Sequence, residues 1–185
     1  DHIGINNDLA RSGSLDELRV VGCAARAKDV PGITEGVADG DTVILGAVSG
    51  QALLTEGHID GHISYVFEDV LFCGDALFGG GCGYLFDGPP LKMFNTLHAL
   101  GAVAPETRVC CAHEYTQDNL TFAWSIEPGN SKLAQRIQEV WAIREDGGCS
   151  IPSTIAQELA TNPFMRQASK EIREAVKLAL PEAPM

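Results

Sequence analysis

The nine residues GHIDGHISY, at positions 57–65, decide how this sequence is interpreted. Each of the two histidines follows a glycine, and the second begins the strand-like run His62–Phe67. Glycine permits the tight backbone conformations found in turns, and side chains held at the end of a rigid sheet are well placed to act as ligands. The pattern therefore predicts a ligand-bearing turn in a fold built of short strands.

Three other stretches concentrate residues that bind metal ions. They are Asp1-His2, Cys73-Gly74-Asp75 and Ala112-His113-Glu114, and the last two follow apolar runs that are predicted strands. Imidazole and carboxylate groups together suit zinc, iron or manganese, and one carboxylate can bridge two ions. A lone histidine at a strand end is more often a hydrogen-bonded structural residue, so it is the combination of four stretches that favours a metal centre.

The chain divides into a strand-rich first part and a helical second part. Strands are predicted over Leu18–Cys23, Thr42–Ala47, Ala52–Thr55, His62–Phe67, Val70–Cys73 and Val109–Ala112. Helices are predicted over Leu91–Leu100, Asn119–Ser125, Ser131–Arg144 with Asn130 as its cap, from the capping residue Thr154 to about Ala160, and over Ser169–Leu180. Strand signals disappear after His113. We therefore expect an α/β layer domain, joined near residue 114 to a small helical domain.

Composition excludes several classes of protein. The formal net charge is −12, from 13 basic and 25 acidic residues, so a nucleic-acid partner is not expected. No apolar run is long enough to cross a bilayer and no export leader opens the chain, which predicts a soluble cytoplasmic protein with no membrane partner. The six cysteines form no CxxC pair and are expected to be reduced and mostly buried. Cys82 is not expected to be a nucleophile, because no activating histidine is implied beside it.

The order of the four stretches resembles the metallo-β-lactamase superfamily, whose first motif is His-x-His-x-Asp-His and of which Asp1-His2 would be the last two residues. The segment at 57–65 resembles GHTxGHISY of the glyoxalase II family in particular. Residues 72–88 are similar to the next block of that family, and HEYTQDN at 113–119 resembles its HEYTxxN signature. Residues 127–128, 152–154 and 162–166 resemble landmarks of its helical domain, so the resemblance extends to about residue 170.

This resemblance implies an αββα sandwich that lacks its first strands, followed by an all-α domain. The implied boundaries are residues 1–113 for the metal-binding domain and 114–185 for a helical glutathione-binding domain. Asp1, His2, Asp75 and His113 would bind one metal ion, and His58 and Asp75 would bind a second, with Asp75 as the bridge. The second ion also needs a His-x-His pair that would precede Asp1, so the chain is interpreted as truncated and is expected to have little activity by itself.

The implied activity is hydrolysis of glutathione thioesters, such as S-lactoylglutathione, to D-lactate and glutathione by a metal-bridging hydroxide. Asp75 and His113 would be catalytic, and the cofactors would be two divalent ions, zinc being expected and iron or manganese being alternatives. The implied substrate-binding residues are Tyr84, Phe86, Tyr115, Asn119, Arg166 and Lys170. Tyr84 departs from the family, which usually has a lysine or arginine there that contacts glutathione.

Two other functions are compatible with the sequence. Iron-dependent persulfide dioxygenases share the superfamily ligands, although the helical region from Glu127 to Arg166 resembles glyoxalase II instead. A non-catalytic glutathione-binding remnant would agree with the missing ligands and with Tyr84. In each case the partner is a small molecule, and we expect a monomer.

Overall fold

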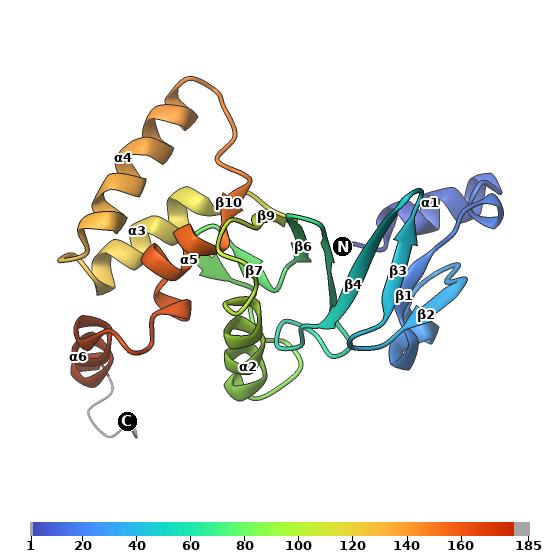
Figure 1. The fold of residues 1–185 in the computed structure, drawn as a ribbon, viewed down its shortest axis with the longest axis horizontal. Helices are drawn as coiled ribbons and strands as arrows, with labels where there is room; N and C mark the ends of the chain where they lie inside the picture. Colours follow the sequence, from blue (N-terminus) through green and yellow to red (C-terminus); the bar gives the residue numbers. More distant parts are fainter. Residues whose placement is uncertain (1, 180–185) are drawn as a thin grey trace.

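A mixed six-stranded sheet forms the centre of the computed structural model, which describes residues 2–179 (Figure 1). The order of its strands is β10-β9-β6-β5-β4-β3. These strands are β3 (Thr42–Leu45), β4 (Val48–Leu54), β5 (Ile63–Phe67), β6 (Val70–Gly74), β9 (Arg108–Cys111) and β10 (Ser153–Thr154). Neighbouring strands are antiparallel except β6 and β9, which are parallel.

Helix α2 (Pro90–Leu100) lies in the crossover between β6 and β9 and covers one face of the sheet. Its buried side chains Met93, Leu97 and Leu100 pack against Leu71 and Val109 of the two parallel strands. Proline in the first turn suits this helix, because the amide it lacks would have no partner there. The crossover fixes the parallel pairing, which brings the carboxyl ends of β6 and β9 to one edge.

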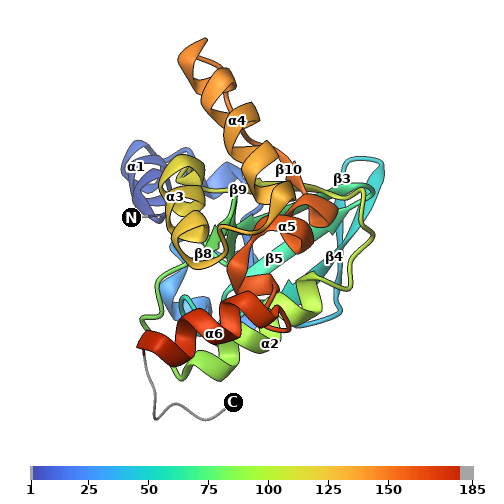
Figure 2. The ribbon, with the colours of Figure 1, turned by 90° about the vertical axis from the view of Figure 1, so that its left-hand side faces the viewer.

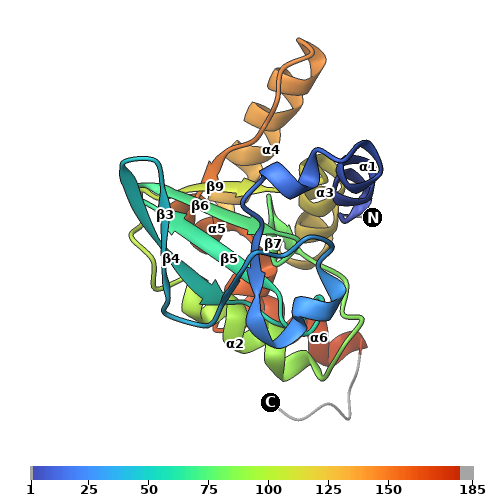
Figure 3. The same ribbon diagram turned by 90° about the vertical axis from the view of Figure 1, so that its right-hand side faces the viewer.

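The N-terminal segment forms a smaller layer beyond β3 and β4 (Figure 3). It contains α1 (Gly4–Ser12), the 3-10 helices η1 (Leu15–Glu17) and η2 (Ala24–Asp29), and the parallel pair β1 (Val21–Cys23) and β2 (Glu35–Val37). Val37 packs with Val43 and Ala52 in a second core cluster, so this layer is joined to the main sheet through apolar contacts.

The C-terminal part is mainly helical and lies on the opposite side of the sheet from β1 and β2 (Figures 1 and 2). Its elements are α3 (Thr116–Ile126), α4 (Ser131–Glu145), α5 (Ile155–Thr161), η3 (Pro163–Met165) and α6 (Lys170–Ala179). Leu120 of α3 and Leu133 of α4 are fully buried in a third cluster. The predicted caps are confirmed: Asn130 accepts from Lys132 and Leu133, and Thr154 accepts from Gln157.

The predicted α/β layer and the helical part after it are confirmed, with two main differences. Helix α1 was missed because it is only nine residues long and largely polar, with no buried residue, so its apolar positions are too few to indicate a helix. The expectation that no strand follows His113 is wrong, because Ser153 and Thr154 pair with β9 and add a short edge strand. The predicted end of the last helix, Leu180, lies outside the described residues. Within the described part, no helix is long and apolar enough to span a bilayer.

Glu127 connects the helices of the C-terminal part. Its carboxylate is buried and accepts hydrogen bonds from the Arg166 guanidinium at 2.9 and 3.0 Å and from the Asn130 amide at 2.9 Å, with another from Ser169. Burial alone would raise the pKa of Glu127, but these donors outweigh it and lower the pKa to about 2 from an ordinary value of 4.5. The carboxylate therefore stabilises the fold in its ionised form.

We expect this interaction to be lost in acid. A carboxyl whose pKa is lowered by folding contributes fully above its unfolded value of 4.5, and the contribution falls as the pH drops towards 2. Thermal melts of the protein and of Glu127→Gln should therefore differ strongly at pH 7, differ less at pH 3, and converge only when the pH falls to about 2 or below. Glu145→Gln, on the exposed end of α4, is the control and should leave the melting temperature unchanged at every pH tested. A difference between parent and Glu127→Gln that stays constant over this pH range would contradict the prediction.

Candidate metal centre

Four side chains from distant parts of the sequence converge at one edge of the main sheet. Asp75 follows β6 and His113 follows the parallel strand β9, so both lie at carboxyl ends that the parallel pairing places together. His58 lies in the loop from β4 to β5, whose antiparallel pairings bring that loop to the same edge. His2 reaches the edge from just before α1.

The convergence is close. His2 Nε2 lies 2.7 Å from Asp75 Oδ2, and His58 Nε2 lies 3.4 Å from the same oxygen. His113 Nε2 lies 3.6 Å from the other oxygen, Oδ1, and 3.3 Å from His2 Nε2. One ligand atom from each of His2, Asp75 and His113 lies within 4.8 Å of the others. His2 and His58 thus lie near one oxygen of Asp75 and His113 lies near the other.

The Asp75 carboxylate indicates what this cluster can bind. The residue is only 6% exposed, and among the described residues its Oδ1 has no hydrogen-bond partner. A buried anionic oxygen without a partner is costly, and such groups are normally paired or coordinate a metal. The donors are three imidazole nitrogens and a carboxylate, a set that suits zinc, iron or manganese. The residues present therefore fit a bound metal centre.

The backbone after the hairpin of β7 (Leu77–Phe78) and β8 (Gly81–Cys82) orients His58. Nδ1 of His58 lies 2.7 Å from the carbonyl oxygen of Tyr84, so the ring donates there and directs Nε2 towards Asp75. Gly83 packs so closely that a Cβ atom on it would lie 2.0 Å from the Asp75 carbonyl oxygen and 2.9 Å from His58 Nδ1. Sequence analysis did not identify this support, although the glycines at 79–81 and 83 were the available signal.

His62 is hydrogen-bonded to Thr55 and is not one of the four converging side chains. Its Nδ1 lies 2.8 Å from Thr55 Oγ1, and the Thr55 hydroxyl also contacts Ser64 at 2.7 Å. Burial, helped by the nearby charge of His58, lowers the pKa of His62 to about 4, so the ring is neutral near pH 7. Burial raises the pKa of the Cys82 thiol to about 11, which agrees with the expectation that Cys82 is not a nucleophile.

Three of the predicted substrate-binding side chains lie beside the centre and form what we call the aromatic rim: Tyr84, Phe86 and Tyr115. The Phe86 ring lies 5.2 Å from that of His58 and 4.9 Å from that of Tyr84. On the other side, Tyr115 stacks on His113 at 5.1 Å. All three are substantially exposed, Tyr84 at 73%, so the rim is available to a ligand.

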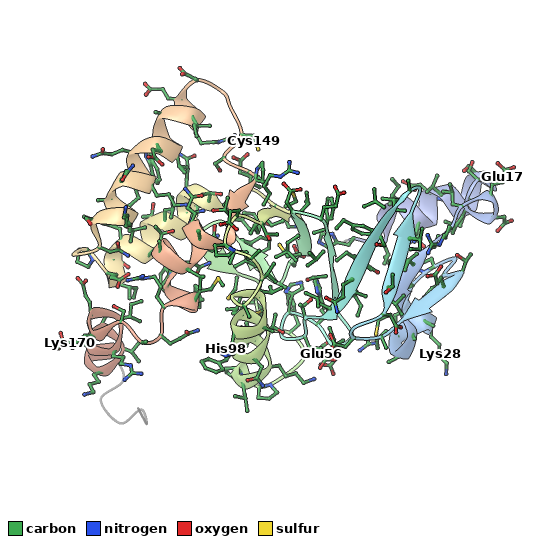
Figure 4. All side chains as sticks on the ribbon, viewed as in Figure 1. Glu17, Lys28, Glu56, His98, Cys149 and Lys170 are labelled. Atoms are coloured by element: carbon green, nitrogen blue, oxygen red, sulfur yellow. The ribbon has the colours of Figure 1, made fainter. Side chains whose placement is uncertain are left out.

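The other predicted residues have different surroundings. Asn119 donates to the Gly79 carbonyl at 3.1 Å, and Arg166 is held by Glu127. Lys170 extends from α6 on the helical side of the molecule, where its side chain is 90% exposed and lies 3.7 Å from Glu174 (Figure 4). Asp1, the remaining predicted ligand, lies outside the described residues.

Comparison with known proteins agrees with this geometry. Residues 1–113 match the family model of the metallo-beta-lactamase superfamily. The solved structure of ETHE1 from Myxococcus xanthus matches with a TM-score of 0.60 and 24% identity, covering 94% of this chain and 64% of its own. TTHA1623, solved in a di-iron-bound form, matches with a TM-score of 0.55 and 23% identity, covering 89% and 72%. Fold and site together define a protein of the metallo-β-lactamase superfamily, which implies a dinuclear metal site.

The family within this class follows from sequence relatives. Residues 114–184 match the model of the hydroxyacylglutathione hydrolase C-terminus. The hydroxyacylglutathione hydrolase of Methylococcus capsulatus is 45% identical over 186 residues, covering 100% of this chain and 71% of the relative. That of Rhodobacter capsulatus is 43% identical over 187 residues, covering 100% and 72%. The chain belongs to the hydroxyacylglutathione hydrolase family, the glyoxalase II family that its motifs resemble.

Replacing the shared carboxylate should remove the metal. We expect Asp75→Asn, which keeps the shape but not the charge, to weaken zinc affinity by at least about a hundredfold, since even outer partners of metal ligands are worth 10–100-fold. The measurement is elemental analysis after equilibrium dialysis. Asp69→Asn is the control: Asp69 precedes the same strand at its other end and pairs with Arg108 at the surface. Equal zinc content in Asp75→Asn and the parent would show that the centre is misplaced.

Proposed function

We propose that this protein hydrolyses thioesters of glutathione, with S-lactoylglutathione split to D-lactate and glutathione. The relatives at 45% and 43% identity are named hydroxyacylglutathione hydrolase. The single observation that carries the proposal is the buried carboxylate of Asp75, which faces three histidines and has one oxygen without a hydrogen-bond partner in the described part of the chain. Such a centre can hold two divalent ions, and we infer zinc as the metal.

The chain supplies the ligands and their orientation. We assign His2 and His113 to one ion and His58 to the other, with Asp75 between them and Asp1 as a further ligand. When bound, the ions lower the pKa of a water molecule towards about 7 and polarise the thioester carbonyl. The Tyr84 carbonyl holds His58 in the tautomer whose Nε2 is free to bind.

The reaction needs no separate proton donor from the protein. A free thiol has a pKa of about 8.5, so glutathione leaves readily as a thiolate. The ionisable groups behind the centre agree with this. His62 is neutral and bonded to Thr55, and the pKa of Cys82 is raised by burial. Neither is placed to transfer a proton to the substrate, so the ligands and the aromatic rim carry the activity.

The aromatic rim is suited to the thioester end of the substrate. Tyr84 and Tyr115 offer hydroxyl donors beside apolar rings, an arrangement that can hold a peptide-like ligand. We assign the glutathione carboxylates to Arg166 and Lys170 of the helical part, residues 114–185, and the metal centre to residues 1–113. Because Arg166 is engaged by Glu127, its contact with substrate would have to be shared with that carboxylate. We infer that the protein acts as a cytoplasmic monomer.

The direct test is hydrolysis of S-lactoylglutathione by the zinc-loaded protein, followed through the loss of thioester absorbance. Asp75→Asn, prepared and loaded in the same way, is the matched control. We expect any turnover by the parent to depend on metal and to be low in the absence of the His-x-His pair that the second ion also needs, and we expect none in the variant. A parent protein that binds zinc tightly and leaves the thioester intact would overturn the proposal.

Tyr84 provides a prediction about substrate affinity. Tyr84→Lys places a cation at the exposed end of the rim, where the family usually has one, and should lower KM for glutathione thioesters about threefold with little change in kcat. Tyr84→Gln separates the loss of the ring from the gain of charge. The difference between the lysine and glutamine variants should shrink at high salt. An unchanged or higher KM for the lysine variant, relative to glutamine, would contradict this assignment.

A further inference from the structure

A short hairpin links the metal centre to the helical part. Strands β7 (Leu77–Phe78) and β8 (Gly81–Cys82) are antiparallel, with Gly79 and Gly80 as the turn. Gly80 has φ +71° and lies against Leu120 of α3, so only glycine fits there without strain. Asp75 comes just before this hairpin, and Gly83 and Tyr84, which support His58, come just after it.

Side chains of the helical part hold the turn of this hairpin. Glu158 of α5 accepts a hydrogen bond from the Gly80 amide, with its Oε2 at 2.9 Å. Asn162 donates to the Gly81 carbonyl at 2.9 Å, and Asn119 of α3 donates to the Gly79 carbonyl at 3.1 Å. The backbone of the turn is therefore fixed from outside the sheet, and Glu158 is its only charged contact among the described residues.

Burying a glutamate at this position costs free energy. Its side chain is fully buried, and its Oε1 pairs at 2.6 Å with Arg136, which is 2% exposed. Removing two charges from water costs several kcal/mol per ion, so a buried ion pair is weak evidence for stability and is often replaceable by apolar residues. The pair allows a full charge to be held at the Gly80 amide, which a neutral acceptor would bind less strongly.

The hairpin contacts the ligands on all sides of the centre. The ring of Phe78 lies 6.1 Å from that of His113 and 5.3 Å from that of Tyr115. Gly83 packs against both the Asp75 carbonyl and His58, and the Tyr84 carbonyl accepts from His58. A shift of the turn would therefore move the supports of Asp75, His58 and His113 together.

We propose that Glu158 is a positioning residue for the metal centre, acting through the Gly80 amide and the β7–β8 hairpin. This inference rests on the proposed metal centre but not on the identity of the substrate. Glu158 does not touch the ligands. It fixes the backbone of the hairpin, and the hairpin and the residues after it orient Asp75, His58 and His113. The geometry of the metal ligands therefore depends on the packing of α4 and α5, which carry Arg136 and Glu158.

The test is a cobalt(II) titration of the metal-free protein, read from the visible absorption bands that report ligand geometry. The informative variant replaces both partners, Arg136→Met with Glu158→Leu, so that no buried charge is orphaned and the fold is retained. We expect the double variant to bind cobalt about tenfold more weakly, the lower end of what supports of metal ligands contribute, and with shifted bands. Glu158→Gln keeps an acceptor for Gly80 and should have an intermediate affinity.

Glu127→Gln is the matched control, because Glu127 is the other buried glutamate of the helical part that pairs with an arginine, and it makes no contact with the hairpin. It should lower the melting temperature and leave the cobalt spectrum unchanged. Parental affinity and spectrum in the double variant would overturn the proposal, as would a loss of affinity that Glu127→Gln reproduces. If that double variant does not fold, Arg136→Met with Glu158→Gln, which keeps an acceptor for Gly80 and leaves no buried charge unpaired, decides by the same criteria. Hydrolysis is measured separately, so a centre that binds cobalt normally without turnover counts against the proposed function alone.

Discussion

The buried carboxylate of Asp75 determines how the rest of the molecule is arranged. An anion with only 6% of its surface exposed must be compensated, and the chain brings three imidazoles to it from residues 2, 58 and 113. This is possible because β6 and β9 are parallel and end at the same edge, and α2 makes that pairing possible as the crossover. The parallel pairing of β6 and β9 and the three histidines at their edge therefore both help to compensate the buried carboxylate of Asp75.

In the helical part, buried acidic side chains are compensated by arginines and amides. Glu127 and Glu158 are both buried, and each is paired with one arginine and at least one amide. Asp75 differs because its described neighbours are imidazoles, which are good ligands and weak counter-ions near neutral pH. Among these three acids, the one without a permanent cation lies at the edge where a metal ion is expected.

Much of the fold was predictable because apolar runs and caps are local signals. The strands around Thr42–Leu45, Ile63–Phe67 and Val70–Gly74, and the Asn130 cap, were expected in nearly the observed places. The convergence of His58, Asp75 and His113 also agrees with the residues that the motifs indicated. The partners of Arg166 and Glu158 were not predictable, because a charged residue looks the same in the sequence whether it faces water or a buried partner of opposite charge. The two-residue strands β7 and β8 are too short to produce any periodicity.

The contact between His58 and the Tyr84 carbonyl has a consequence for how this site can change over evolution. The support comes from the main chain, so it is present whatever side chain occupies position 84. A substitution there can alter the charge and shape offered to a ligand while the orientation of the histidine is kept. The side chain at position 84 is therefore not needed to orient His58, and a tyrosine can occupy the position while the Tyr84 carbonyl still holds the histidine. Substrate specificity can therefore change through position 84 while the metal ligands and their orientation stay the same.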